Sequence, residues 1–299
     1  MNQNSKCGCA AECSRSTSAF PPQHQDRQPG LEYRMVPLPE SECRRPGRRL
    51  ENKTALITGG DSGIGRATAY DFVKEGASVA IVYYDEKEDA DKTAARIGEL
   101  GGRCLLLCGD LKEPCFAKHC VDRTIECFGK LDILVNNHAV QFVQRSILDI
   151  SHEQLELTFR NNVFSFIYLI QYALPYMKRG GSIINTTSVT AYQGNKELID
   201  YSAAKGAIVS LTRSLSLSLA EKGIRVNGVA PGPIWTPLIP ASFSEEEVAS
   251  FGKKTSPVPM GRAGQPCEVS PCYVFLASDE SCYMTGQVLH PNGGTIVGA

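Results

Sequence analysis

The feature that most constrains the fold of this chain is a glycine-rich segment, residues 58–65, with the sequence TGGDSGIG. A short apolar run at 54–57 precedes it, and apolar residues recur at helical spacing through 66–76. A strand, a glycine turn and a helix form the setting in which such a loop binds a dinucleotide. The glycines let the backbone approach the pyrophosphate, and the helix dipole favours its charge. An ordinary tight turn is the alternative, which the rest of the chain disfavours.

A candidate catalytic set lies in the second half of the chain. Tyr201 and Lys205 are four residues apart, so on a helix they share a face and the ammonium lies beside the phenol. A nearby cation favours the phenolate, which predicts a lowered tyrosine pKa and a proton donor and acceptor at Tyr201. Ser188, thirteen residues upstream of Tyr201, would hold the same substrate oxygen. The tyrosine–lysine pair is weak evidence alone and gains weight from the glycine-rich loop.

With these motifs, the chain resembles the short-chain dehydrogenase/reductase family over about residues 50–296. The glycines match the family pattern Thr-Gly-x-x-x-Gly-x-Gly, and Asn162 matches its fourth catalytic residue, which supports a water relay to the lysine. The resemblance implies an NAD(P)(H)-dependent oxidoreductase with the catalytic residues Ser188, Tyr201, Lys205 and Asn162. It implies no metal. The cofactor-binding residues that it implies are Gly59, Asp61, Ser62, Gly63, Ile64, Gly65, Tyr83, Asp110, Leu111, Asn137, Tyr201, Lys205, Pro231, Gly232, Ile234 and Thr236.

The first fifty residues differ from the rest of the chain. Residues 1–50 have little apolar periodicity and are rich in proline and glycine, which predicts an extended N-terminal arm before a NAD(P)-binding domain at 51–299. The part at 20–39 resembles the arm of one branch of the family, the glucose/ribitol-dehydrogenase-like and general-stress aldehyde reductases. We predict that the arm lies across a neighbouring subunit; a disordered tail is the alternative.

The domain alternates strand-like and helix-like segments, which predicts an α/β, doubly wound parallel sheet (a Rossmann fold) in a single domain. Apolar runs typical of central parallel strands occur at 54–58, 78–83, 103–107, 131–135, 181–186, 224–229 and 287–290. Helical patterns separate them at about 64–76, 86–100, 113–128, 152–178, 201–222 and 266–278.

The end of the second predicted strand bears on the choice of cofactor. An NAD-preferring member of the family would carry an acidic residue near Tyr83, to grip the ribose 2′-hydroxyl, and none stands there. Asp85 follows two residues later and could still reach the ribose. Ser62 replaces the basic residue of many NADP-dependent members, which leaves Arg66 as the nearest cation. We expect NADP(H), with NAD as the alternative.

The chain departs from the family after the fourth predicted strand. The usual Asn-Asn-Ala-Gly is replaced by residues 136–139, NNHA, which introduces His138. Either a packing histidine or a catalytic one fits this position, and packing is the more common role.

Composition excludes several classes of partner and site. The formal net charge is −1, so neither nucleic acid nor an anionic membrane is expected as a partner, and no apolar run approaches the length of a membrane span. The twelve cysteines are scattered, with Cys120 and Cys127 at positions suited to small hydrophobes on a helix, which favours free thiols in a reducing, cytoplasmic setting. Cys7, Cys9 and Cys13 could bind a soft metal but lack a second ligand pair.

The substrate is predicted least sharply. Polar residues at 193–196 and apolar residues in a lid at 236–256 would border the reacting centre, although the apolar ones also suit the buried face of a small helix. The resemblance implies a carbonyl or alcohol substrate, with small aldehydes, sugars or polyols ahead of a steroid or polyketide ketone. A non-catalytic dinucleotide-sensing scaffold is the alternative of another class. The resemblance also implies a homotetramer, with Leu211, Leu215 and Leu219 on one face; these leucines could instead pack on their own sheet.

Overall fold

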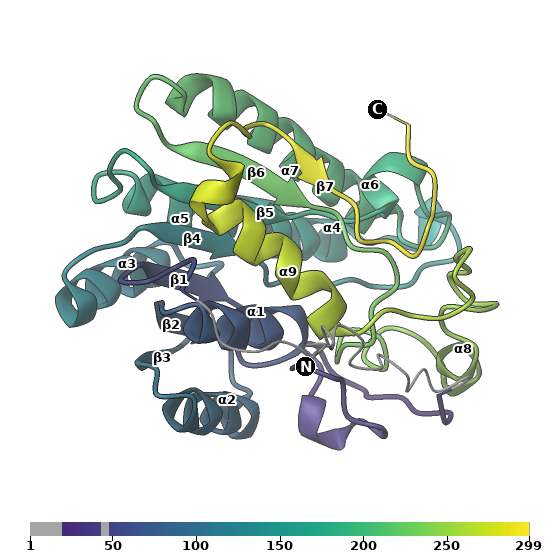
Figure 1. Cartoon of the computed structure of the whole chain (residues 1–299). Helices are drawn as coiled ribbons and strands as arrows, with labels where there is room; N and C mark the ends of the chain where they lie inside the picture. Colours follow the sequence, from purple (N-terminus) through teal and green to yellow (C-terminus); the bar gives the residue numbers. More distant parts are fainter. Residues whose placement is uncertain (1–19, 43–47, 299) are drawn as a thin grey trace, which may run out of the picture.

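The computed structural model describes residues 20–42 and 48–298, and its centre is a seven-stranded parallel sheet with the order β3-β2-β1-β4-β5-β6-β7 (Figure 1). Strands β1 and β4 are buried along their whole length, which explains why both are continuous apolar runs. The predicted doubly wound α/β fold is confirmed. The strands are β1 (Thr54–Thr58), β2 (Ser78–Tyr83), β3 (Cys104–Cys108), β4 (Ile133–Asn136), β5 (Ser182–Thr186), β6 (Arg225–Val229) and β7 (Val288–Leu289).

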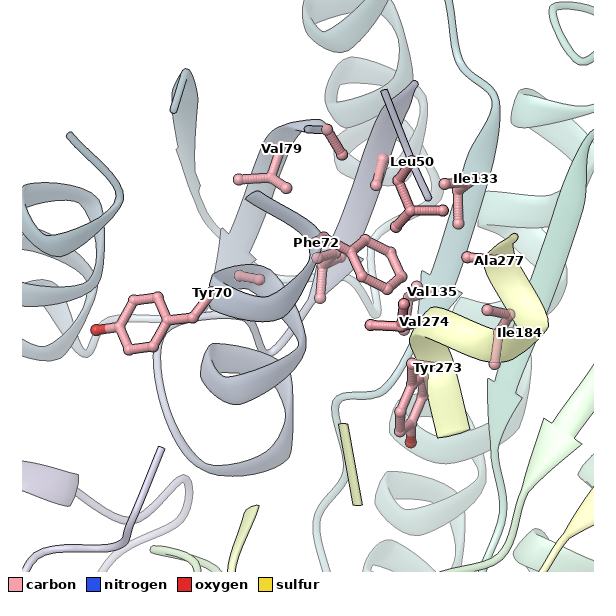
Figure 2. Packing of buried hydrophobic residues seen from close by; sticks show 14 of the residues in the cluster. Leu50, Tyr70, Phe72, Val79, Ile133, Val135, Ile184, Tyr273, Val274 and Ala277 are labelled. Carbon is pink, nitrogen blue, oxygen red and sulfur yellow. The ribbon is translucent and has the colours of Figure 1, made fainter. Parts of the chain in front are cut away.

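Helices cover both faces of the sheet. Successive strand residues point to opposite faces, so Ile57 packs in a cluster with α1 and α9, while Leu56 packs in a second cluster with α3, α5 and α7. Figure 2 shows Phe72 of α1 and Val274 of α9 meeting over the first of these faces. The helices are α1 (Gly63–Lys74), α2 (Lys87–Glu99), α3 (Pro114–Phe128), α4 (His152–Phe159), α5 (Ser165–Ala173), α6 (Thr190–Gln193), α7 (Ile199–Leu219), α8 (Glu245–Ala249) and α9 (Pro266–Ala277).

The prediction of a single helix at about 152–178 is wrong in its continuity and in its end. A π-helical segment at Arg160–Phe164 separates α4 from α5, so the run is not one regular helix. Helix α5 ends at Ala173 because Pro175 has no backbone N–H with which to continue the helical hydrogen bonds. The π-helical turn adds a residue to the backbone turn next to the catalytic centre, and π-helical turns are frequent at functional sites.

The arm lies on its own chain. Residues 20–42 pack against the domain of the same chain. The predicted contact of the arm with a neighbouring subunit stays a prediction. Phe20 stacks on Trp235 with ring centroids 3.9 Å apart, and Met35 is buried in the same cluster. These apolar side chains explain the contact, because their burial removes large apolar surfaces from water.

Two further predictions concern side chains on helices. Leu219 is buried and Leu211 and Leu215 are half-buried against the second core cluster, so these leucines pack on their own sheet. Cys120 is buried as predicted, whereas Cys127 is exposed.

Within residues 20–42 and 48–298, no helix is both long and apolar enough to cross a bilayer, and no group of three or more His, Cys, Asp or Glu side chains could hold a metal ion. The candidate metal ligands Cys7, Cys9 and Cys13 lie outside the described residues.

Candidate active site

The glycine-rich loop links β1 to α1 and has the shape of a dinucleotide cradle. Gly59 and Gly63 have positive φ angles of 59° and 51°, which side chains rarely tolerate. A Cβ atom on Gly65 would lie 1.9 Å from the Gly59 carbonyl oxygen, so only glycine lets α1 pack this close to the strand end. Asn137, which follows β4, holds this loop in place, since its Nδ2 donates to the carbonyl oxygens of Thr58 and Gly59 at 3.1 and 3.2 Å. The residues present therefore fit a pyrophosphate at the start of α1.

A cavity of about 1000 Å³ runs from this loop to the predicted catalytic residues. It lies at the carboxyl ends of the strands, where chain order reverses between β1 and β4 and ligands bind in folds of this type. Of the predicted site residues, Gly65 and Asn162 lie outside its lining. Those that border it are Gly59, Asp61, Ser62, Gly63, Ile64, Tyr83, Asp110, Leu111, Asn137, Ser188, Tyr201, Lys205, Pro231, Gly232, Ile234 and Thr236.

Two hydroxyl groups and one ammonium group lie along the wall of this cavity. Ser188 follows β5, and Tyr201 and Lys205 lie one turn apart on α7, as their spacing predicts. The Ser188 hydroxyl accepts hydrogen bonds from the backbone N–H and the hydroxyl of Thr190, at 3.2 and 3.1 Å, which fixes its position. Lys205 Nζ donates to the Thr186 carbonyl oxygen at 2.8 Å and lies 5.7 Å from the centre of the Tyr201 ring.

The acidity of Tyr201 differs from the expectation. Burial raises the pKa of Tyr201 to about 12, and the hydrogen bond with Ser188 lowers it only in part. Burial also lowers the pKa of Lys205 to about 7, so at neutral pH this side chain carries a full positive charge only part of the time. The predicted lowering of the pKa of Tyr201 by Lys205 is therefore not found; burial raises this pKa, and only the hydrogen bond with Ser188 lowers it.

Asn162 lies in the π-helical segment and is fully buried. Its Oδ1 accepts from the Val140 backbone N–H at 2.9 Å, and its Nδ2 donates to the Val140 carbonyl oxygen at 2.8 Å. Both polar ends of the side chain are thus used to join the π-helical segment to the loop after β4.

His138 is a packing residue with two hydrogen-bonded ring nitrogens. Its Nδ1 lies 2.7 Å from the Thr58 hydroxyl and its Nε2 lies 2.9 Å from the Ser165 hydroxyl, while the ring packs on Phe166. Burial, and to a smaller extent the charge of Lys205, lowers the pKa of His138 to about 3, so the imidazole is neutral at physiological pH. These contacts favour packing, the more common of the two roles considered for this histidine.

The end of β2 carries buried carboxyl groups. Glu86 Oε2 accepts from the backbone N–H groups of Tyr84 and Asp85, and Oε1 lies 3.9 Å from Arg27 Nη2 of the arm. Burial, followed by the charge of Glu86, raises the pKa of Asp61 to about 7. A carboxyl group that is partly protonated at neutral pH repels a 2′-phosphate less than a full carboxylate does, so this corner is compatible with NADP(H).

Arg66 lies beside this corner, since its Nε donates to the Asp61 carbonyl oxygen at 2.8 Å, but it does not border the cavity. Its guanidinium is buried, forms ion pairs with Glu32 and Asp89, and donates to the Thr93 hydroxyl. These partners already use the cation that the sequence placed nearest to the cofactor.

Several residues that border the cavity were missed. Gln28, Pro29 and Gly30 come from the arm, and Gln141 follows β4. No sequence signal pointed to the arm residues, because their position depends on contacts with residues more than a hundred positions away.

The sequence and the structure of this chain are similar to those of known oxidoreductases. A family model described as "Enoyl-(Acyl carrier protein) reductase" matches residues 59–295. The NADPH-dependent aldehyde reductase 1, chloroplastic, of Arabidopsis thaliana is 53% identical, over 93% of this chain and 98% of that protein. The glucose and ribitol dehydrogenase of Daucus carota is 50% identical, over 94% of this chain and 99% of that protein.

Among solved structures, a short-chain dehydrogenase from Burkholderia cenocepacia in complex with NADP has a TM-score of 0.75 and 32% identity, over 83% of this chain and 99% of that one. The shared fold, the extent of these matches and the identities above 30% agree with the motifs of the loop and of α7. The chain is therefore an NAD(P)-dependent oxidoreductase that belongs to the short-chain dehydrogenase/reductase family.

Proposed function

We propose that this chain catalyses the NADPH-dependent reduction of an aldehyde or sugar carbonyl to an alcohol, and the reverse oxidation of a polyol. The proposal rests on one observation: the Ser188 and Tyr201 side chains are hydrogen-bonded at the wall of the large cavity. Lys205 lies one helical turn after Tyr201 on α7. The NADP bound by the Burkholderia cenocepacia enzyme and the NADPH dependence of the Arabidopsis thaliana relative support the cofactor.

The roles of the residues follow from their environments. NADPH supplies a hydride when bound. Tyr201, whose pKa burial raises to about 12, is protonated at neutral pH and donates its proton to the substrate oxygen. Ser188 donates a hydrogen bond to the same oxygen while negative charge develops there. Lys205, with a pKa of about 7, gains and loses protons readily at neutral pH and so restores the proton of Tyr201. Asn162 shapes the π-helical segment that would hold a relay water.

The cavity lining supports small polar substrates. Gln193, Asn195 and Lys196 border it and offer hydrogen bonds to sugar or polyol hydroxyls. A second candidate substrate class, bulky ketones of the steroid or polyketide type, is favoured by the apolar lid. The lid residues Leu238, Ile239, Phe243 and Phe251 border the cavity, and the last three also belong to a buried apolar cluster.

The test is a panel of aldehydes, sugars, polyols and ketones, with the absorbance of NADPH and NADH as the readout. We expect turnover that prefers NADPH and that falls at least a thousandfold in Tyr201→Phe, on the order of the loss when a proton donor is removed. Tyr192→Phe is the matched control, because Tyr192 lies on the neighbouring helix α6 but outside the cavity lining. Activity that survives in Tyr201→Phe would refute the mechanism. A preference for bulky ketones would support the second substrate class.

We also infer a cytoplasmic homotetramer. Exposed apolar side chains support assembly, since Leu217 on α7 is 82% exposed and Leu148 is 90% exposed. Free thiols among the described cysteines, such as Cys108 and Cys282, are typical of a reducing compartment. The mass in solution, measured by light scattering after size exclusion, tests the assembly, and Leu217→Glu should shift it toward smaller species.

A further inference from the structure

The described part of the arm contacts the lid, residues 236–256, and also Trp235 directly before it. Phe20 stacks on Trp235, whose Nε1 donates to the Pro37 carbonyl oxygen at 2.9 Å. The Gln25 backbone N–H donates to the Pro240 carbonyl oxygen at 2.6 Å. Gly30 lies so close to the lid that a Cβ atom there would be 2.2 Å from the Pro237 carbonyl oxygen. The lid is therefore held from outside by the arm.

The arm also contacts the glycine-rich loop. The Glu32 carboxylate accepts from the Gly63 backbone N–H, at the first residue of α1, and pairs with Arg66. The backbone N–H groups of Glu32 and Tyr33 donate to the two oxygens of Asp89 on α2. Residues 28–33 thus run from the lid to the glycine-rich loop, and the first three of them border the cavity.

The side chain of Gln28 forms hydrogen bonds with two segments that border the cavity, the loop after β4 and the lid. Its Oε1 accepts from the Gln141 backbone N–H at 3.0 Å, and its Nε2 donates to the Gln141 carbonyl oxygen. The same Nε2 lies 3.3 Å from the carbonyl oxygen of Ala241 in the lid. One side chain of the arm therefore joins the cavity wall after β4 to the lid on the other side, and it borders the cavity together with Pro29 and Gly30.

We propose that Gln28 is a positioning residue that holds the lid against the cavity wall and so slows the dissociation of the bound dinucleotide. The cavity is bordered by the glycine loop, the wall, the lid and arm residues 28–30. A dinucleotide in it is enclosed while Gln28 bridges the wall and the lid. Its release is faster when that bridge is absent, because opening the lid then breaks fewer hydrogen bonds. This inference rests on the proposed function, since it concerns the same cavity.

The chain supplies a matched control in the arm. Gln23 also has both amide ends bonded: Nε2 to the carbonyl oxygens of Pro21 and Val36, and Oε1 to the Val36 backbone N–H. These partners belong to the arm itself, and Gln23 does not border the cavity. Gln23→Ala therefore removes as many hydrogen bonds as Gln28→Ala without separating the lid from the wall.

The first experiment measures the dissociation rate of NADPH from the full chain by stopped-flow fluorescence, with excess NADP as the chase. We expect Gln28→Ala to release NADPH at least tenfold faster than the unsubstituted protein, and Gln23→Ala to stay within twofold. Gln28→Glu keeps the acceptor for Gln141 N–H but sets a carboxylate against two carbonyl oxygens, so it should release NADPH at least as fast as Gln28→Ala. Equal rates for Gln28→Ala and Gln23→Ala would overturn the proposal.

The second experiment needs no cofactor. Hydrogen exchange of the amides in residues 236–256 should be faster in Gln28→Ala than in Gln23→Ala, while exchange within α1 stays the same. Unchanged exchange in the lid would also overturn the proposal. Failure of the unsubstituted chain to bind NADPH would instead refute the proposed function, and the exchange comparison would still decide whether Gln28 holds the lid.

Discussion

Lys205 is expected to destabilise the folded protein in the absence of ligands. The side chain is completely buried, and burial lowers its pKa from an ordinary 10.5 to about 7. Between these pH values the unfolded chain holds a proton on Lys205 that the folded chain releases, so the unfolded state binds more protons and stability rises with pH. With about 1.4 kcal/mol per pKa unit, the penalty is roughly 4 kcal/mol at pH 7 and roughly 2 kcal/mol at pH 9.

The substitution Lys205→Met tests this penalty, because methionine keeps most of the volume and carries no charge. It also removes the hydrogen bond to the Thr186 carbonyl oxygen, which costs about 2 kcal/mol at any pH. We therefore expect Lys205→Met to be about 2 kcal/mol more stable than the unsubstituted protein at pH 7 and about equal to it at pH 9. For a chain of 299 residues, 1 kcal/mol corresponds to about 1.6 °C in Tm, so the difference at pH 7 is about 3 °C.

The assay is thermal unfolding of the ligand-free protein at several pH values between 7 and 9. Lys196→Met is the control, since the Lys196 side chain is 88% exposed and its removal should shift Tm equally at each pH. A Tm difference between Lys205→Met and the unsubstituted protein that does not shrink as pH rises would refute the reasoning. Loss of turnover in Lys205→Met, together with a raised Tm at pH 7, would show a stability penalty at a residue needed for catalysis.

Two other buried groups give predictions of pH dependence. Because burial lowers the pKa of His138 to about 3, its imidazole signals in NMR should not titrate between pH 5 and 8; a midpoint near 6 would contradict its neutral packing role. Burial raises the pKa of Glu32 from 4.5 to about 7, so the folded protein binds more protons than the unfolded one in that window and stability falls as pH rises through it. Glu32→Gln should remove this fall, so its Tm relative to the unsubstituted protein should be higher at pH 8 than at pH 5, and a constant difference would contradict the raised pKa.

The sequence predicted the sheet and the catalytic spacing because both depend on local patterns. Buried parallel strands are continuous apolar runs, and the glycines of the β1–α1 loop are required by the close packing seen at Gly65. The break between α4 and α5 was missed because the π-helical segment is only five residues long, too short to interrupt the apolar periodicity visibly. The raised pKa of Tyr201 was missed because a spacing of four residues predicts the neighbouring lysine but not how completely both side chains are buried.

The arm illustrates a different limit, one set by distance along the chain. Phe20 and Trp235 are 215 positions apart, and no periodicity in either segment indicates that their rings stack. Proline and glycine predicted an extended arm, and the described part of it contains one short 3-10 helix, Glu32–Arg34. Backbone groups outside regular structure need partners, which the lid and α2 supply. Because the same segment contacts the lid, the cavity wall and the glycine loop, the arm is better described as one wall of the site than as an appendage of the domain.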